Sequence, residues 1–350
     1  MDRYDRQERV KQIGTTGQAR ISQATVLIVG VGGLGSYAAV ILARAGVKKL
    51  ILVDPDTVSS TNLQRQALFT ERDCQEHRFK VAAVKDHLQA INSSVEVVAI
   101  PAPLTADLIV DNHFDLCLDG LDNYRGRALL NELAIEHHFD YVFASCAGNY
   151  GNVMAISPQK HPCLTCLFPD IKQLMNTDCD VIGVNAALLP LVAGMQSSIA
   201  LHYLVDRSTV DFDHLITYDN WSMTANRFKV SKQATCPACQ RHQQISTDKG
   251  GSQLTMLCGA NAYYIRLTRE VKLSSWANYL NSLGALTTSN PLFIQFKWAN
   301  RPVSLFKNGK LVMYDLADRA AAEGQLNSII KLAKQIREGT SNDSSRHFDN

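Results

Sequence analysis

Near the start of the chain, four glycines and an aspartate have the spacing of a phosphate-binding turn. They lie in the stretch 25–56, TVLIVGVGGLGSYAAVILARAGVKKLILVDPD. Glycines let the backbone approach a phosphate closely, and the N–H groups that open the following helix attract the anion. An acidic residue ending the next strand can accept a hydrogen bond from a ribose hydroxyl. The pattern predicts a bound nucleotide at Gly30, Gly32, Gly33, Gly35 and Asp54.

Further polar residues should approach the same turn from loops and helix starts. They are Asn62, Arg65, Gln66, Lys80 and Asp122. Ligands of open α/β sheets bind beyond the carboxyl ends of the strands, so Asp119 and Asp122 are expected beside the phosphates or their metal. Arg65 and Lys80 can neutralise a polyphosphate, and Asp122 can hold Mg²⁺. The glycine pattern with its acid would favour NAD, whereas this polar set favours a triphosphate.

Two CxxC pairs account for four of the nine cysteines. They are Cys163 with Cys166 and Cys236 with Cys239. Four thiolates in two such pairs are typical of a structural Zn²⁺ site, which has no open position for water. A redox CxxC is the alternative, but neither pair is predicted at the start of a helix that follows a strand. We therefore expect a zinc ion that joins two remote segments.

Cys179 lies outside both pairs, just before a predicted helix. A helix N-terminus lowers the pKa of a thiol and favours a nucleophilic thiolate. The neighbouring Asp178 and Asp180 would raise the pKa of that thiol. A lone cysteine often serves as a small hydrophobic residue. The residues alone leave both interpretations open.

The order of predicted elements indicates an α/β fold, a Rossmann-like doubly wound sheet. Strands are expected at 26–29, 50–53, 95–100 and 114–118, with helices between them and a charged loop at 58–78. A zinc-stapled half follows, and the Asn308–Gly309 turn between apolar runs predicts a hairpin in a small α+β C-terminal unit. The predicted division is a nucleotide-binding domain with the zinc site at 1–240, a linker at 241–253, the small domain at 254–338 and a disordered tail at 339–350.

Composition narrows the class of protein. The chain has 350 residues, 46% of them hydrophobic, with a formal net charge of +2. Lys and Arg are scattered, which gives no electrostatic reason to expect nucleic acid or a membrane surface as a partner. The charged start has no apolar signal core, so we expect a cytoplasmic protein. Residues 181–205 are long and apolar enough to span a bilayer, but their polar and proline positions favour a core or subunit-interface helix.

Several motifs together resemble the ubiquitin-activating-type adenylyltransferases, the ThiF/MoeB/HesA family. They are RYDRQ at 3–7, GVGGLG at 30–35, DPDTV at 54–58, NLQRQ at 62–66, LDN at 121–123 with Arg127 following, and the paired CxxC motifs. The resemblance covers about residues 1–240 and is strongest to the branch that activates ubiquitin-like sulfur carriers. The C-terminal unit resembles the extension of Bacillus-type ThiF proteins.

The resemblance implies ATP-dependent adenylylation of the C-terminal glycine carboxylate of a ThiS- or MoaD-like carrier, in thiamin thiazole or molybdopterin biosynthesis. It implies that Asp54 holds the ribose, that Asn62, Arg65 and Lys80 engage phosphates with help from Gln66, and that Asp122 binds Mg²⁺. It also implies a homodimer in which Arg6 reaches the partner's site. Cys179 matches a cysteine that forms an acyl disulfide with the carrier in some members, and a cysteine desulfurase or a rhodanese would donate the sulfur.

Three departures from the family pattern affect geometry and substrate preference rather than reaction class. Leu121 stands where threonine is usual, residues 77–80 read HRFK in place of a GQPK-like sequence, and Ala187 replaces a common proline. The alternatives are adenylylation of a ribosomal peptide C-terminus, an NAD(P)-binding oxidoreductase, and a catalytically silent, zinc-containing scaffold that binds a carrier. The intact set of Arg65, Lys80 and Asp122 disfavours the last two.

Overall fold

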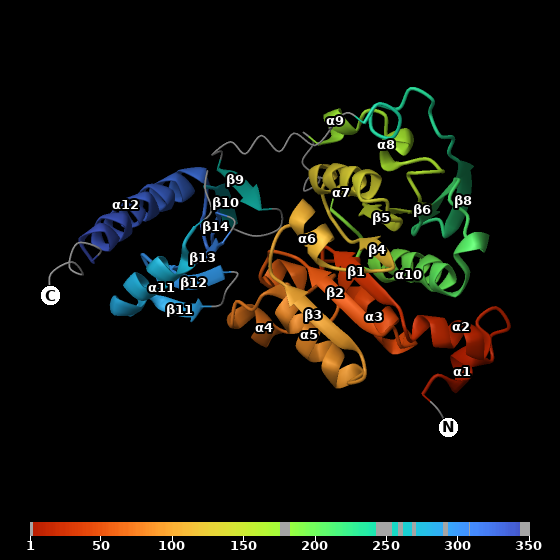
Figure 1. Ribbon diagram of the computed structural model, residues 1–350, viewed down its shortest axis with the longest axis horizontal. Coiled ribbons are helices and arrows are strands. Elements are labelled where there is room, and N and C mark those ends of the chain that lie inside the picture. Colours follow the sequence, from red (N-terminus) through yellow and green to blue (C-terminus); the bar gives the residue numbers. More distant parts are fainter. Residues whose placement is uncertain are drawn as a thin grey trace, which may run out of the picture. The chain divides into compact units, whose positions relative to one another are not determined.

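A computed structural model gives the fold (Figure 1). It describes residues 3–175, 183–242, 254–257, 262–267, 271–289, 293–307 and 309–343. The chain divides into two compact units, residues 1–247 and 248–350. The assignment of these units to an adenylyltransferase domain and a separate small domain stays a prediction.

An eight-stranded sheet forms the centre of the first unit, with strand order β3-β2-β1-β4-β5-β6-β7-β8. The strands are β1 Thr25–Val29, β2 Lys49–Val53, β3 Glu96–Ile100, β4 Leu116–Asp119, β5 Tyr141–Ala147, β6 Tyr150–Ile156, β7 His214–Asp219 and β8 Thr224–Lys229. Strands β1 to β5 run parallel, and β6, β7 and β8 continue the sheet antiparallel. The carboxyl ends of β1, β2 and β4 therefore meet at one edge, as the doubly wound prediction requires.

Helices cover both faces of the parallel strands, which explains why these strands are almost entirely apolar. The helices of this unit are α1 Asp5–Glu8, α2 Gly14–Ile21, α3 Gly35–Ala45, α4 Glu71–Gln75, α5 Lys80–Ile91, α6 Ala106–Asp111, α7 Tyr124–Glu136, α8 Leu164–Leu167, α9 Ile171–Leu174 and α10 Leu188–Asp206. On one face, Leu27, Val29, Ile51 and Val53 pack with α6, α7 and the four paired cysteines in a single core. Helices α3, α5 and α10 contact one another and the sheet.

Helix α10 is the apolar segment that resembles a membrane span. Residues Leu188–Thr209 are long and apolar enough to cross a bilayer, with a mean hydropathy of 1.4 over the best window. Its inner side chains, including Leu189, Val192 and Gln196, are buried, and the helix packs on α2, α3 and β4 to β6. These contacts are those of a core helix, the interpretation that the sequence favoured.

The segment predicted as one charged loop, 58–78, contains two short helices. Ser59 is the N-cap residue of a 3-10 helix at Ser60–Asn62. Thr70 caps the N-terminus of α4, where its side chain accepts a hydrogen bond from the Asp73 N–H. These helices have one or two turns, too short for an apolar period to show in the sequence. His77, where the resemblance placed a glycine, has a φ of +49°, a left-handed conformation that glycine adopts more easily.

A six-stranded antiparallel sheet with order β11-β12-β13-β14-β10-β9 forms the second unit. Its elements are β9 Thr255–Leu257, β10 Ala262–Arg266, α11 Leu273–Ser282, β11 Leu286–Ser289, β12 Phe293–Trp298, β13 Arg301–Phe306, β14 Lys310–Met313 and α12 Arg319–Asp343. Alternate strand residues pack with α11 and α12 in one core. Strands β13 and β14 form the predicted hairpin, although Asn308 itself lies outside the described residues. Helix α12 extends to Asp343, so residues 339–343, predicted to be disordered, are helical.

Candidate nucleotide site and four-cysteine cluster

Three glycines bring the turns after β1 and β4 into direct backbone contact. Gly30 has a φ of +87°, which only glycine adopts without strain. A Cβ on Gly35 would lie 1.9 Å from Gly30 O, and a Cβ on Gly120 would lie 2.2 Å from the same oxygen. Gly120 was missed as a site residue because its contact is with a residue 90 positions earlier in the chain.

The turn leads directly into α3, whose first N–H groups face the anion position expected from the sequence. The residue preceding α3, Leu34, supplies no side-chain hydrogen bond to these groups. Unpaired N–H groups at a helix N-terminus carry partial positive charge and favour phosphate. Gly32 adjoins Gln66, since a Cβ there would meet Gln66 Nε2 at 3.4 Å, and Gly33 packs on Leu189.

Asp54, Asp56 and Lys80 form a buried charged group beside this turn. Asp54 accepts from the Val31 N–H at 2.7 Å and from the Asp56 N–H at 2.8 Å. The Lys80 ammonium lies 3.3 Å from Asp56 Oδ2. Burial raises the pKa of Asp54 to about 6, against the opposing field of Lys80. Burial would lower the pKa of Lys80, but Asp54 and Asp56 outweigh it and hold that pKa above its ordinary value. Lys80 is therefore a fixed cation.

The NLQRQ loop places three of its polar residues differently. Asn62 is buried, and its Oδ1 accepts from the Ser59 N–H at 3.2 Å, which shapes the loop. Gln66 is buried beside Gly32, and its Oε1 accepts no hydrogen bond from any residue in the described ranges. Arg65 is half-buried, and its guanidinium donates to Thr61 O at 2.7 Å.

Asp122 and Asp119 follow the same strand but have different surroundings. Asp122 is exposed, receives a hydrogen bond from Asn123 Nδ2 at 3.0 Å, and lies near enough to Lys80 to affect its pKa. Asp119 was expected beside the phosphates, and this expectation is wrong. Its carboxylate is fully buried and lies 3.3 Å from Arg127 Nε. Burial raises its pKa to about 6, with Arg127 opposing the shift.

Arg6 is not part of this group. It is exposed on α1, in a segment fastened to the opposite end of α3. The Gln7 amide donates to Ala45 O at 3.1 Å, and Tyr4 packs against Gly46, the residue that ends α3. Helix α3 has 11 residues, or about 16 Å at about 1.5 Å per residue. Arg6 therefore lies at the far end of α3 from the glycine turn of its own chain.

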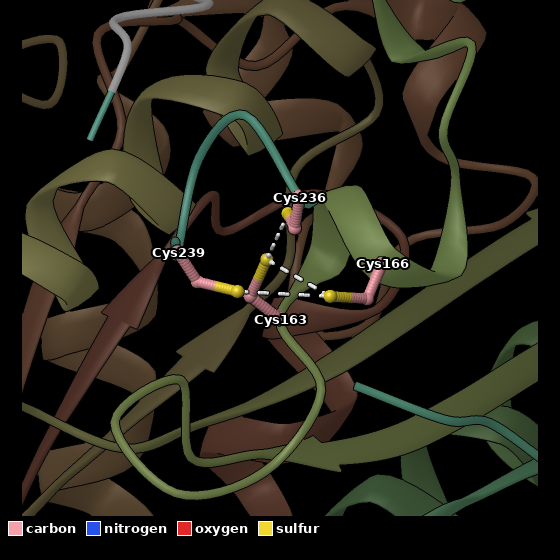
Figure 2. A group of neighbouring side chains, drawn as sticks. All are labelled: Cys163, Cys166, Cys236 and Cys239. Carbon is pink, nitrogen blue, oxygen red and sulfur yellow. Dashed lines mark hydrogen bonds between the residues drawn. The ribbon is translucent and has the colours of Figure 1, made fainter. Parts of the chain in front are cut away.

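The four paired cysteines converge in one buried cluster (Figure 2). Cys163 Sγ lies 3.8 Å from Cys166 Sγ and 3.7 Å from Cys236 Sγ, and Cys166 Sγ lies 3.7 Å from Cys239 Sγ. A disulfide needs about 2 Å, whereas tetrahedral Zn–S bonds of about 2.3 Å place sulfurs about 3.8 Å apart. The hydrogen bond with Cys163 lowers the pKa of Cys166 to about 5 and raises that of Cys163.

The cluster is held from α7 and from the second CxxC segment. Asn131 Oδ1 accepts from the Leu164 N–H at 2.9 Å, which fixes α8 against α7. The Gln233 N–H points at Cys166 Sγ at 3.5 Å, the type of contact that stabilises a thiolate. The donor set and spacing fit Zn²⁺. Cys179 lies outside the described residues, so its surroundings are not part of this site.

Together, the parallel sheet, the glycine turn and the charged group define a nucleotide-binding α/β protein with a four-cysteine staple. The model of the ThiF family matches residues 4–238. The chain belongs to the ThiF family.

The similarity to one curated relative extends beyond the family match, over 92% of the chain. The sulfur carrier protein ThiS adenylyltransferase of Bacillus subtilis is 30% identical over 328 residues, 92% of this chain and 97% of that protein. The sulfur carrier protein adenylyltransferase of Thermus thermophilus is 34% identical over 68% of this chain and 90% of its own length. The adenylyltransferase and sulfurtransferase MOCS3 of Aedes aegypti is 31% identical, and the chain spans 56% of its length.

Solved structures share the fold. The crystal structure of E. coli MccB with ATP aligns with a TM-score of 0.59 at 22% identity, over 68% of this chain and 74% of that chain. This likeness concerns the architecture alone.

Proposed function

We propose that this protein is an ATP-dependent adenylyltransferase that activates the C-terminal carboxylate of a ubiquitin-like sulfur carrier. The observation that carries the proposal is the convergence of Lys80, Asp54 and Asp122 on the glycine turn. The printed names of the two bacterial relatives describe this activity in those proteins. The carrier belongs to thiamin thiazole or molybdopterin biosynthesis.

In the proposed reaction, a carboxylate oxygen of the carrier attacks the α-phosphorus of ATP. The bond from that phosphorus to the oxygen bridging to the β-phosphate breaks, and pyrophosphate leaves with the electron pair. The carboxylate is already a competent nucleophile, so the chain's residues act by positioning and by charge stabilisation. Asn62, Arg65 and Lys80 engage the phosphates with help from Gln66. The N-terminus of α3 binds a phosphate, and Asp54 holds the ribose.

Two metal ions complete the proposal. Mg²⁺ would be held by Asp122 and the phosphates, where it supplies charge neutralisation to the departing pyrophosphate. Zn²⁺ would be held by Cys163, Cys166, Cys236 and Cys239 and would have a structural role. The buried, thiol-only donor set supports that second assignment.

A carrier also needs a docking surface, and an apolar patch of three side chains lies at the appropriate edge of the sheet. Tyr150, Trp221 and Met223 are 62%, 80% and 70% exposed. Tyr150 pairs with Ala147 at the carboxyl end of β5 and with Asp219, where the β7–β8 turn begins. Four strand spacings of about 4.8 Å separate β7 from β1, so about six extended residues of a carrier tail would reach the glycine turn.

The proposed assembly is a homodimer in which Arg6 serves the partner's nucleotide. Its place at the far end of α3 supports a role in the partner's site rather than in its own. On α10, Leu191 is 43% exposed and Ser198 and His202 are also exposed, so this helix offers a mixed apolar and polar surface for a second copy. Cys179, carrying as a persulfide the sulfur supplied by a cysteine desulfurase or a rhodanese, would attack the acyl-adenylate, so that an acyl disulfide forms and AMP leaves.

ATP–pyrophosphate exchange tests the proposal. Purified protein, Mg²⁺, ATP and labelled pyrophosphate are combined with each sulfur carrier of the same organism, and with each carrier lacking its last glycine. We expect exchange with one intact carrier and none with its truncated form. Exchange with no carrier, from folded and zinc-replete protein, would contradict the proposed substrate class and favour a peptide C-terminus instead.

A further inference from the structure

The backbone of one residue, Leu121, is held at both of its polar atoms, which belong to two consecutive peptide units, by a single buried ion pair. Its N–H donates to Asp119 Oδ1 at 2.9 Å, and its carbonyl accepts from Arg127 Nη2. Arg127 Nε lies 3.3 Å from Asp119 Oδ2, and Nη2 also donates to Ala144 O on β5 at 3.0 Å. The next residue along the chain is Asp122. The orientation of the Leu121 backbone therefore sets the position from which the Asp122 side chain extends.

The surroundings of the Arg127–Asp119 pair indicate that it orients the turn, and not only that it neutralises two buried charges. Arg127 is 4% exposed and Asp119 is fully buried. The guanidinium lies 5.4 Å from the centres of both the Tyr124 and Phe143 rings, which fix its plane. Replacing a buried ion pair with apolar residues is often neutral or stabilising, so burial of this pair is weak evidence for a role in stability. The Arg127 guanidinium donates from Nη2 to two carbonyls while its Nε faces the Asp119 carboxylate, a planar arrangement that lysine cannot reproduce.

In the part of the chain that the structure describes, other hydrogen bonds fix the ends of the turn, and the ion pair holds the backbone of its middle residue, Leu121. The Gly120 N–H donates to Val29 O at 2.8 Å. Gln196 Nε2 on α10 donates to Asp119 O at 2.9 Å and to Val142 O at 2.8 Å. These bonds secure the end of β4, and the Leu121 side chain packs against the neighbouring core, while the ion pair holds the Leu121 N–H and carbonyl.

We infer that Arg127 and Asp119 are positioning residues of the adenylation site: they fix the Leu121 backbone so that Asp122 faces Lys80 and the metal-bound phosphates. This inference rests on the proposed function and adds two residues that do not themselves touch the substrate. Its consequence is specific. Loosening the pair should weaken the use of Mg²⁺ and leave nucleoside binding unchanged.

The test compares Arg127→Lys with Arg207→Lys in the full chain. Arg207 is a matched control, since its Nε lies 2.7 Å from Asp140 Oδ2 and its guanidinium lies near the Tyr203 and Phe212 rings. Asp140 precedes β5, so this second pair lies at the opposite edge of the sheet. Both variants lose an arginine that pairs with an aspartate and lies near two aromatic rings. Arg127 is buried whereas the Arg207 side chain is 49% exposed, and only Arg127 adjoins the nucleotide turn.

The readout is ATP–pyrophosphate exchange against free Mg²⁺, together with adenosine affinity by calorimetry. We expect Arg127→Lys to raise the Mg²⁺ midpoint and lower kcat, each by about 10-fold or more. Adenosine affinity should stay within about twofold, and Arg207→Lys should change neither quantity. Asp119→Asn keeps the acceptor for the Leu121 N–H but loses the charge, and should give an intermediate shift if Arg127→Lys does not fold.

Equal thermal destabilisation by both arginine variants, with unchanged Mg²⁺ midpoints, would overturn the inference. If the wild-type protein shows no exchange with any carrier, the Mg²⁺ dependence of ATP binding replaces exchange as the readout. That outcome would count against the proposed function, and the positioning role would still be decided by the two arginine variants.

Discussion

At the scale of single residues, the proposed nucleotide site combines Asp54, a carboxyl with a raised pKa, and Lys80, an ammonium that stays protonated. Burial raises the pKa of Asp54 to about 6, with Lys80 opposing the rise. The Asp54 carboxyl is thus almost entirely ionised above pH 7 and largely protonated at pH 5. Since only the ionised form accepts freely from a ribose hydroxyl and from two backbone N–H groups, nucleoside binding should depend on pH.

The first prediction concerns adenosine, which has no phosphate to titrate in this range. Its affinity should be constant above pH 7 and fall by about 10-fold between pH 7 and pH 5, as Asp54 gains its proton. Calorimetry across that range checks the prediction. In Asp54→Asn the affinity should be weak and independent of pH, and a wild-type affinity that does not change with pH would contradict the role of Asp54.

Replacing Lys80 should have two consequences. Lys80→Met should reduce pyrophosphate exchange by about 10²- to 10³-fold, because a preorganised cation at the phosphates is lost. It should also move the pH dependence of adenosine binding upward, because Lys80 holds the pKa of Asp54 down. Lys85, on the same helix, provides the control as Lys85→Met. An unmoved pH profile in Lys80→Met would show that the two groups are not coupled.

At the scale of elements, the site depends on two turns that touch. The contact of Gly30 with Gly120 leaves no room for a side chain, so the turns after β1 and β4 are fixed relative to each other. The first turn carries the phosphate-binding N–H groups, and the second carries Asp122. Any substitution that separates the two turns should affect both functions.

Gly120→Ala should therefore be strongly damaging. The added Cβ would lie 2.2 Å from Gly30 O, which we expect to cost about 1–3 kcal/mol of unfolding free energy and to abolish tight nucleotide binding. Gly194→Ala on α10 is the control, because a Cβ there meets nothing within 4 Å and should be neutral or stabilising by up to about 1 kcal/mol. Urea unfolding measures both variants. Equal stability of the two would refute the contact.

The sequence predicted those elements whose signals lie within a short stretch of chain, and it failed where the deciding contact joins distant residues. Local signals, apolar runs and glycine spacing, were sufficient for the strand–turn–helix at 25–53 and for the CxxC pairs. Strand β11, Leu286–Ser289, was missed because its Thr and Ser residues give no apolar alternation. Asp119 was misplaced because its partner, Arg127, becomes a neighbour only when α7 folds back on β4 and β5.

At the scale of the whole molecule, the cysteine cluster joins segments that are 70 residues apart, counted from Cys166 to Cys236. Closing so long a loop has an entropic cost that a metal site can offset. We predict one zinc per chain by elemental analysis. Chelation, or Cys236→Ser, should lower the melting temperature by about 10 °C or more. Cys74→Ser is the control at a partly buried cysteine outside the cluster. Full stability of zinc-free protein would exclude the structural role.

The proposed dimer makes a prediction that a monomer cannot satisfy. Arg6→Ala and Lys80→Ala proteins should each be inactive alone. After subunit exchange, half of the dimers would be mixed, and each mixed dimer would have one intact site. The rate of ATP–pyrophosphate exchange should therefore return to about a quarter of the wild-type value, a statistical estimate for a symmetric dimer. No recovery from verified mixed dimers would place Arg6 in its own subunit's site or outside the reaction.

The central claim is that a carboxylate at a carrier's C-terminus becomes an acyl-adenylate, and intact-mass analysis of the carrier tests it most directly. The carrier is incubated with this protein, ATP, Mg²⁺ and pyrophosphatase, which removes the second product, and is then weighed. We predict a carrier heavier by one adenylyl group, with no change in the carrier that lacks its terminal glycine or in reactions with Lys80→Met. An unmodified carrier in every reaction, with ATP bound and the protein folded, would contradict the account.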